Sequence, residues 1–138
     1  MADYSLPVRV YYEDTDAAGV VYYANYLKFM ERARTEYLRD LGFEQDELRE
    51  RAGIQFVVRR AELDYLEPAR FNEKLTVTAS LTALKRASLR FGQEVFRAGE
   101  EAGRPLCRGG VDIACVDAVS MRPARIPESV MEVFQGVR

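Results

Sequence analysis

One long segment of the sequence has helical periodicity, whereas the other patterned segments favour strands. The helical segment runs from 25 to 41, and its apolar positions follow i, i+4, i+7, i+11 and i+15 spacing: Tyr26, Met30, Ala33, Tyr37 and Leu41. Such a broad apolar face predicts a helix of about four turns that is buried along one side. Gly42 follows directly and supplies the usual C-terminal stop. The chain is therefore expected to fold around one central helix.

The remaining pattern predicts a sheet around this helix. β-branched and aromatic residues, or two-residue alternation, mark five expected strands at 8–12, 54–66, 75–82, 87–95 and 106–117. The last two flank a turn at 98–103 and should form an antiparallel hairpin. A polar loop at 13–19, a short helical turn at 44–52 and a short helix at 128–134 complete the expected elements. Together they predict an α+β fold in which the sheet curls around the helix.

The length of the chain favours one domain. With 138 residues, the whole of 1–138 fits a single unit with one core. A single sheet of this size leaves an edge and a face uncovered, and a second copy can cover them. We therefore expect a homo-oligomer, at least a dimer, with a tetramer forming as a dimer of dimers.

The sequence contains no histidine, which excludes several kinds of active site. Ser-His-Asp and Cys-His nucleophile systems, HExxH metal sites and histidine pH switches are all ruled out in their usual forms. Any catalysis must use carboxylates, lysine, tyrosine, cysteine or backbone dipoles. Neither a metal site nor a redox cofactor is indicated.

Net charge and the two cysteines limit which partners and which cellular compartment are expected for the protein. The net charge of -2 is not typical of a nucleic-acid-binding protein, although a local basic patch can still bind one phosphorylated ligand. Cys107 and Cys115 lie on one expected strand, about 27 Å apart at roughly 3.4 Å per residue, so we expect two free buried thiols. Reduced thiols, the absence of a leader and the absence of an apolar run of roughly 20 residues predict a cytoplasmic protein.

The loop between the first strand and the helix carries the densest chemical signal. It contains the carboxylates of Glu13, Asp14 and Asp16, and Gly19 allows a ligand to approach the backbone closely. The first turn of the helix offers unpaired N–H groups that can hold an oxyanion while a nearby carboxylate acts as base or nucleophile. The residues alone leave a second interpretation open, in which Asp14 and Asp16 only shape the loop and cap the helix.

The sequence from 12 to 36, YEDTDAAGVVYYANYLKFMERARTE, resembles the signature of hotdog-fold acyl-CoA thioesterases of the 4-hydroxybenzoyl-CoA thioesterase family. It most resembles the YbgC-like branch, which is associated with the tol-pal system of Gram-negative bacteria. The likeness continues in FVVRR at 56–60, YLEPAR at 65–70, RASL at 86–89, CVD at 115–117 and RP at 122–123. It thus covers nearly the whole chain.

The resemblance implies a hotdog fold, in which a curved antiparallel sheet of about five strands wraps a long central helix. It implies hydrolysis of acyl-CoA or acyl carrier protein thioesters to the free acid and thiol, without a cofactor. Asp16 would be the catalytic carboxylate, as nucleophile or as base on water, and the backbone N–H of Tyr23 would polarise the thioester carbonyl. Many YbgC-like members carry histidine at the position of Tyr23, and tyrosine there is similar to the 4-hydroxybenzoyl-CoA enzyme.

Several further residues are candidates for binding the substrate. In the loop after Asp16, the backbone of Gly19 and Val20 can approach the substrate. The basic or polar residues suited to CoA phosphates are Arg59, Arg60, Lys85, Arg86 and Ser88. Arg122 and Arg125 are additional cations. Each of these charges is equally well explained as a solvated surface residue. The resemblance implies a site in a cleft at a dimer interface, where assembly decides which cations meet.

Two glutamates on the expected helix are alternative candidates for the catalytic carboxylate, because other hotdog thioesterases place their carboxylate there. The spacing instead favours structural pairs, of Glu31 with Arg34 or Thr35 and of Glu36 with Arg32. We therefore interpret both glutamates as structural.

Two other functions stay open on the sequence. An enoyl-thioester hydratase of the same fold normally needs a paired histidine, which this chain lacks. A non-catalytic protein that binds acyl thioesters would keep the fold without the reaction. The missing histidine disfavours the hydratase, and the presence of Asp16 favours the thioesterase over the non-catalytic protein.

Overall fold

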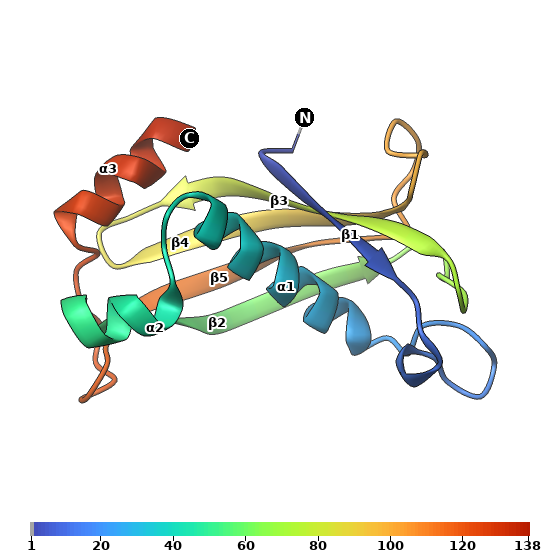
Figure 1. Ribbon diagram of the computed structural model, residues 1–138, viewed down its shortest axis with the longest axis horizontal. Coiled ribbons are helices and arrows are strands. Elements are labelled where there is room, and N and C mark those ends of the chain that lie inside the picture. Colours follow the sequence, from blue (N-terminus) through green and yellow to red (C-terminus); the bar gives the residue numbers. More distant parts are fainter. Residues whose placement is uncertain (1) are drawn as a thin grey trace.

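The computed structural model describes residues 2–138 and shows a five-stranded antiparallel sheet with a long helix packed along it (Figure 1). The strands are β1 (Tyr4–Arg9), β2 (Ile54–Tyr65), β3 (Lys74–Leu84), β4 (Ser88–Arg97) and β5 (Cys107–Asp117). They lie in the order β1-β3-β4-β5-β2, and all neighbours are antiparallel. The predicted α+β class, the sheet of about five strands and the hairpin of β4 with β5 are confirmed.

The central helix α1 (Asn25–Asp40) confirms the segment predicted from periodicity. Its inward face is fully buried at Phe29, Met30 and Ala33, each 0% exposed. Burying a large apolar side chain contributes roughly 1.5–3 kcal/mol, so packing against the sheet holds this helix in place. Gly42 ends the helix region with a φ of +100°, a conformation that glycine adopts without steric cost.

β1 lies further toward the N-terminus than the predicted strand at 8–12, whose bounds are wrong. It pairs with β3 over Tyr4–Arg9. The chain then turns into a 3₁₀ helix at Tyr12–Asp14, so the aromatic pair in the sequence does not extend the strand. The turn is stabilised locally because the carboxylate of Asp14 accepts the backbone N–H of Tyr11 at 2.8 Å.

The shorter elements lie where the sequence predicts them. Helix α2 (Gln45–Glu47) continues into a π-helical turn at Leu48–Ala52. The C-terminal helix α3 (Glu128–Val137) lies at the end of the sheet where β2 begins (Figure 1). Its Phe134 is buried, with its ring centroid 6.1 Å from that of Phe56 on β2. This contact extends the core beyond α1.

Both cysteines lie on β5, where they are free and buried. Burial raises the pKa of the Cys107 thiol to about 12 and that of the Cys115 thiol to about 11. Both thiols therefore stay protonated and unreactive at neutral pH. The expectation of free buried thiols is confirmed, and the reducing compartment stays a prediction.

The two outer strands of the sheet differ in length. Within residues 2–138, β1 pairs only with β3, and β2 pairs only with β5. β2 is 12 residues long, against 6 for β1. Its outer side therefore presents a long row of backbone N–H and C=O groups that can pair with another strand.

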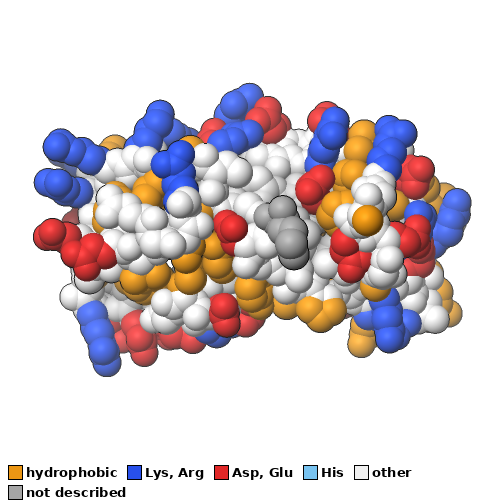
Figure 2. Space-filling model, turned by 90° about the horizontal axis from the view of Figure 1, so that it is seen from above, with side chains coloured by type: hydrophobic (Ala, Val, Ile, Leu, Met, Phe, Trp, Pro, Cys, Tyr) orange, Lys and Arg blue, Asp and Glu red, His pale blue; other side chains and the backbone are white. Residues whose placement is uncertain are grey.

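The surface carries charges of both signs. On the face shown in Figure 2, the Lys and Arg side chains are interspersed with those of Asp and Glu. This mixture agrees with the near balance of 20 basic and 22 acidic residues in the chain. In the described part of the chain, no helix is long and apolar enough to cross a membrane.

Gly109 allows β5 to lie close to β2, and we predict that a side chain there destabilises the fold. A Cβ atom on Gly109 would overlap the backbone carbonyl of Glu62 on the neighbouring strand. We expect Gly109→Ala to lower the free energy of unfolding by roughly 1–3 kcal/mol, measured by urea denaturation. Gly136→Ala is the matched control, because a Cβ on this helical glycine meets nothing within 4 Å. Equal stability of the two variants would contradict the prediction.

Candidate functional site

The loop between β1 and α1 is held against the turn that connects β2 to β3. The N–H of Val21 donates to the carbonyl of Ala69 at 2.8 Å, and the N–H of Phe71 donates to the carbonyl of Gly19 at 3.3 Å. The rings of Phe71 and Tyr12 stack with centroids 4.0 Å apart. The loop is thus fixed at the end of the sheet where α1 begins (Figure 1).

Asp14 shapes this loop. Its side chain is 8% exposed and accepts the N–H of Tyr11, while its carbonyl accepts the N–H of Tyr22 at 2.9 Å. The same carbonyl accepts the side-chain amide of Asn25, the first residue of α1, at 2.8 Å. The carboxylate and the backbone carbonyl of Asp14 therefore both accept hydrogen bonds from within the chain. For Asp14, the structural interpretation is confirmed.

Asp16 is exposed, and its carboxylate is only partly used by the loop. One oxygen accepts the N–H of Ala18 at 2.9 Å, which closes an Asx turn. The backbone of Asp16 donates to Val20 and accepts from Gly19, whose φ is +79°. No residue of 2–138 donates a hydrogen bond to the second carboxylate oxygen, so that oxygen faces solvent.

The chain around Tyr23 leaves two backbone donors free. The carbonyl of Tyr22 accepts the N–H of Asn25 at 2.8 Å, and the N–H of Leu27 donates to Ala24 at 3.2 Å. Neither the N–H of Tyr23 nor that of Ala24 has an acceptor within residues 2–138. Both lie at the positive end of the dipole of a 16-residue helix, where a developing negative charge is stabilised.

Tyrosine side chains surround this helix end. The hydroxyl of Tyr65, the last residue of β2, donates to the carbonyl of Tyr23 at 3.1 Å. The hydroxyl of Tyr26 accepts the N–H of Ala69 at 3.1 Å. Desolvation by burial raises the pKa of both Tyr26 and Tyr65, so both phenols stay protonated at neutral pH. Tyr65 can therefore remain a hydrogen-bond donor throughout the neutral range.

The residues predicted from the sequence fall into separate groups. Asp16, Gly19, Val20 and Tyr23 share one loop, as expected. Arg59 and Arg60 lie in the middle of β2, about 20 Å along the strand from Tyr65, and Arg60 pairs with Glu62 at 3.3 Å. Within one chain, these arginines are therefore too far from the loop for both to contact the same thioester group.

The basic turn between β3 and β4 lies at the opposite end of the sheet (Figure 1). It is roughly 35 Å, the length of β3, from the end that holds the loop. The N–H of Lys85 donates to the carbonyl of Ser88 at 2.8 Å, and the carbonyl of Arg86 accepts from Ile126. The side chains of Lys85 and Arg86 are exposed and form no ion pair with a carboxylate in the described chain. Arg122 and Arg125 are also exposed, in the segment after β5.

The two helix glutamates are structural. The carboxylate of Glu31 accepts the hydroxyl of Thr35 at 2.7 Å, as the spacing predicts. Glu36 pairs with Arg39 and not with Arg32, so its predicted partner is wrong. Arg32 instead lies over the ring of Phe29, 5.8 Å from its centroid, which is a cation–π contact.

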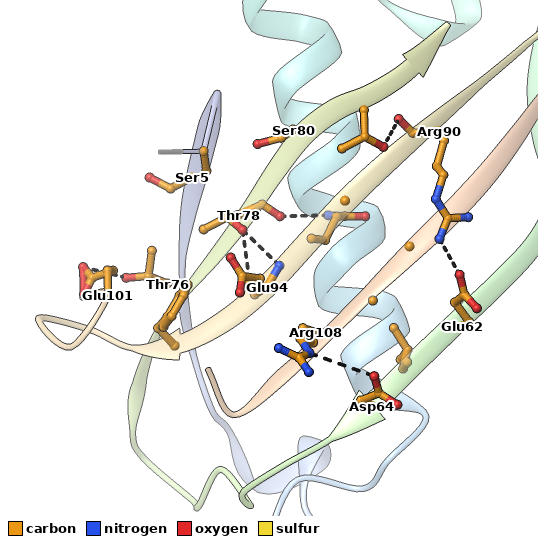
Figure 3. A pocket seen from close by; sticks show the side chains of 18 residues that line it. Ser5, Glu62, Asp64, Thr76, Thr78, Ser80, Arg90, Glu94, Glu101 and Arg108 are labelled. Carbon is orange, nitrogen blue, oxygen red and sulfur yellow. Dashed lines mark hydrogen bonds and ion pairs between the residues drawn. The ribbon is translucent and has the colours of Figure 1, made fainter. Parts of the chain in front are cut away.

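A cavity of about 1010 Å³ lies on the sheet face opposite α1 (Figure 3). Side chains from β3 line it with hydroxyl groups: Thr76, Thr78, Ser80 and Thr82. Figure 3 shows Arg90 directed at Glu62 and Arg108 directed at Asp64, so its cations are already paired. None of the residues predicted as catalytic or substrate-binding lines this cavity.

The structure adds residues that the sequence analysis did not single out. Asn25 ties the helix to the loop, Ala69 accepts Val21, and Tyr65 holds the carbonyl of Tyr23. Tyr65 and Ala69 belong to the YLEPAR segment at 65–70, which the resemblance covers. The likeness of that segment to the family was the only sequence signal for these two residues. Their contact with the loop joins positions more than 40 residues apart, which the sequence pattern does not reveal.

Comparison with known proteins adds a family assignment to this geometry. The model of the thioesterase-like superfamily matches residues 10–134. The acyl-CoA thioesterase YbgC of Haemophilus influenzae is 43% identical over 135 residues, covering 98% of this chain and 96% of that protein. Hypothetical protein TT1821 of Thermus thermophilus superposes with a TM-score of 0.89 at 29% identity, covering 99% and 100% of the two chains. The 1,4-dihydroxy-2-naphthoyl-CoA thioesterase Slr0204 of Synechocystis superposes with a TM-score of 0.85 at 21% identity, covering 96% and 95%.

Proposed function

The chain belongs to the thioesterase-like superfamily, and from this premise we propose that it hydrolyses acyl-CoA thioesters with Asp16 as its catalytic carboxylate. It has the hotdog fold, in which the antiparallel sheet wraps α1. Its acyl-CoA thioesterase activity follows from the similarity to YbgC over nearly the whole chain. The roles of single residues rest on the local geometry.

One observation carries the residue assignment. The loop that holds the half-free carboxylate of Asp16 leads directly into the free N–H of Tyr23 at the start of α1. A carboxylate and a backbone donor at a helix N-terminus are the two groups that thioester hydrolysis needs in a chain without histidine. Gly19 supports substrate access, because a Cβ there would meet nothing within 4 Å and its backbone is exposed.

In the proposed reaction, the N–H of Tyr23 donates to the thioester carbonyl oxygen and stabilises the negative charge that develops there. The carboxylate of Asp16 either adds to the carbonyl carbon or removes a proton from the water that adds. The C–S bond then breaks, and its electron pair leaves with sulfur as a thiolate. Thiols ionise at about pH 8.5, so the leaving group needs no strong acid. In the first route, water then hydrolyses the mixed anhydride to regenerate Asp16.

The cations at Lys85 and Arg86 belong to the same proposal, as contacts for the phosphates of CoA. They are exposed and free of carboxylate partners in the described chain. Because they lie a strand length from their own loop, we propose that they serve the site of another copy. Arg59 and Arg60, in the middle of β2, and Ser88, the first residue of β4, are proposed to act across the same interface.

The open edge of β2 supports this assembly. Two antiparallel β2 strands can pair through a twofold axis and join two five-stranded sheets into one. Val58 on this strand is 52% exposed, which is unusual for valine on a sheet and is explained if a second copy covers it. The polar sheet face opposite α1 is then left for a second dimer. We expect this assembly in the cytoplasm, in line with its free thiols, and cell fractionation tests that location.

We predict that Asp16→Asn abolishes most hydrolysis while the protein still folds and binds substrate. Asparagine keeps the size of the side chain and the bond to Ala18, but it cannot attack or deprotonate water. We expect kcat to fall by at least about 100-fold and KM to change by less than about threefold, measured with a series of acyl-CoA and acyl carrier protein thioesters.

Asp14→Asn is the control for Asp16→Asn. It should lower stability, because Asp14 is buried and holds the N–H of Tyr11, and it should affect kcat much less. Equal and small effects of the two substitutions on kcat would show that the carboxylate is assigned wrongly. Glu31 and Glu36 on α1 would then be the next candidates.

Arg86→Ala tests the contact with CoA phosphates. We expect KM for an acyl-CoA to rise about two- to fivefold with kcat nearly unchanged, as for the loss of an exposed charge contact. Added salt should raise KM of the wild type more than KM of the variant. Arg49→Ala removes another exposed arginine and should change neither constant. An unchanged KM for Arg86→Ala would remove Arg86 from the site.

Val58→Glu tests the proposed pairing of β2 strands. A charge at this exposed position should disfavour the dimer, and light scattering at micromolar concentration should then give a smaller mass than for the wild type. Val119→Glu is the control, because Val119 is 93% exposed in the loop after β5. A wild-type protein that is a monomer and still hydrolyses thioesters would rule out the shared site.

A further inference from the structure

The carbonyl of Tyr23 is not part of the hydrogen-bond ladder of α1. The N–H of Leu27, which would pair with this carbonyl in a regular helix, donates to Ala24 instead. The only donor to the Tyr23 carbonyl within residues 2–138 is the hydroxyl of Tyr65, at 3.1 Å. A side chain 42 residues away therefore holds the turn that leads into the central helix.

Two hydrogen bonds together fix the orientation of the backbone at Tyr23. On its N-terminal side, the carbonyl of Tyr22 is held by the N–H of Asn25. On its C-terminal side, the carbonyl of Tyr23 is held by Tyr65. Because a trans peptide is planar, with N–H and C=O pointing in opposite directions, each bond also directs one free N–H away from the helix. The two N–H groups directed in this way are those of Tyr23 and Ala24.

The ring of Tyr65 is itself well placed to hold this bond. Tyr65 is the last residue of β2, where it pairs with Cys107 of β5. Its ring centroid is 5.6 Å from that of the buried Tyr26 and 6.1 Å from that of Tyr23, in an edge contact at 85°. The ring contacts therefore limit the positions that the Tyr65 hydroxyl can take. Because Tyr65 belongs to β2, the sheet in this way fixes the Tyr23 carbonyl before α1.

We infer that Tyr65 is a positioning residue for thioester hydrolysis, which acts by holding the Tyr23 carbonyl so that the free N–H of Ala24 faces the substrate carbonyl as a second donor beside the N–H of Tyr23. This inference rests on the proposed function. It assigns to Tyr65 no contact with the reacting atoms. Its effect is expected on the step in which charge develops on the carbonyl oxygen, and not on the binding of CoA.

Tyr65→Phe tests the inference, because it removes the hydroxyl and leaves the ring contacts with Tyr23 and Tyr26. Since Tyr65 is 48% exposed, the variant should fold with little change in Tm. We expect kcat to fall about tenfold, the factor that corresponds to one neutral hydrogen bond, with KM unchanged within about twofold. Binding of an S-alkyl CoA thioether, which has no carbonyl, should be unchanged. Amide hydrogen exchange at Asn25, whose N–H donates to the neighbouring carbonyl of Tyr22, should become faster.

Tyr12→Phe is the matched control. It removes a phenol hydroxyl from the same end of the molecule, where Tyr12 is 78% exposed and its hydroxyl holds no backbone group of the described chain. Its kcat, KM and hydrogen exchange should equal those of the wild type. A kcat of Tyr65→Phe equal to that of the wild type, while Asp16→Asn is inactive, would overturn the inference and leave the proposed function intact.

Two further outcomes are distinguishable. A higher KM for Tyr65→Phe at unchanged kcat would place Tyr65 in contact with substrate, which contradicts a positioning role. A wild-type protein that hydrolyses no acyl-CoA or acyl carrier protein thioester would overturn the proposed function, and the inference would fail with it. The wild-type assay thus separates the two failures.

Discussion

The candidate site depends on how α1 is seated on the sheet, and one buried amide determines that seating. Gln93 of β4 is 2% exposed and donates to the carbonyls of Met30 on α1, at 3.0 Å, and Thr78 on β3, at 3.1 Å. It also accepts the guanidinium of Arg34 at 2.9 Å. A buried polar group without partners costs roughly 1–3 kcal/mol, so a helix shifted along its axis would lose several of these bonds together. The apolar face carries no such directional bonds, so the Gln93 network favours this position of α1 over positions shifted along its axis.

With α1 fixed, the end of the helix becomes a defined point at one end of the sheet. The side-chain amide of Asn25 ties the start of α1 to the loop by donating to the carbonyl of Asp14. The carbonyl of Ala69, in the turn after β2, accepts the N–H of Val21 and holds the other side of the loop. Three segments that are far apart in the sequence therefore meet around the same short stretch of backbone. This explains how an exposed loop can present a carboxylate and free N–H groups in a fixed arrangement. Its rigidity comes from buried backbone bonds, while Asp16 itself stays accessible.

The sequence predicted the elements whose signal is local. The apolar period of α1 and the alternation of β3 determine burial residue by residue, so both appear in the structure close to their predicted bounds. β1 was misplaced because the aromatic residues after Arg9 favour a strand, whereas the carboxylate of Asp14 captures the backbone there. The role of Tyr65 and the partner of Glu36 depend on which side chains meet after folding, and no spacing encodes that.

The absence of histidine changes which residues the proposed reaction constrains. Only proline removes a backbone N–H, so every other side chain at position 23 keeps the donor itself. What a substitution can change is the direction of the donors. The Tyr65 hydroxyl directs the N–H of Ala24 through the Tyr23 carbonyl, and the backbone N–H of Asn25 directs the N–H of Tyr23 through the Tyr22 carbonyl. Neither Tyr65 nor Asn25 touches the thioester in the proposed mechanism. In a site without histidine, substitution is expected to be least tolerated at the side chains that position the backbone donors, as it is at the histidine of a histidine-dependent site. Only the carboxylate of Asp16 must act through its own chemistry.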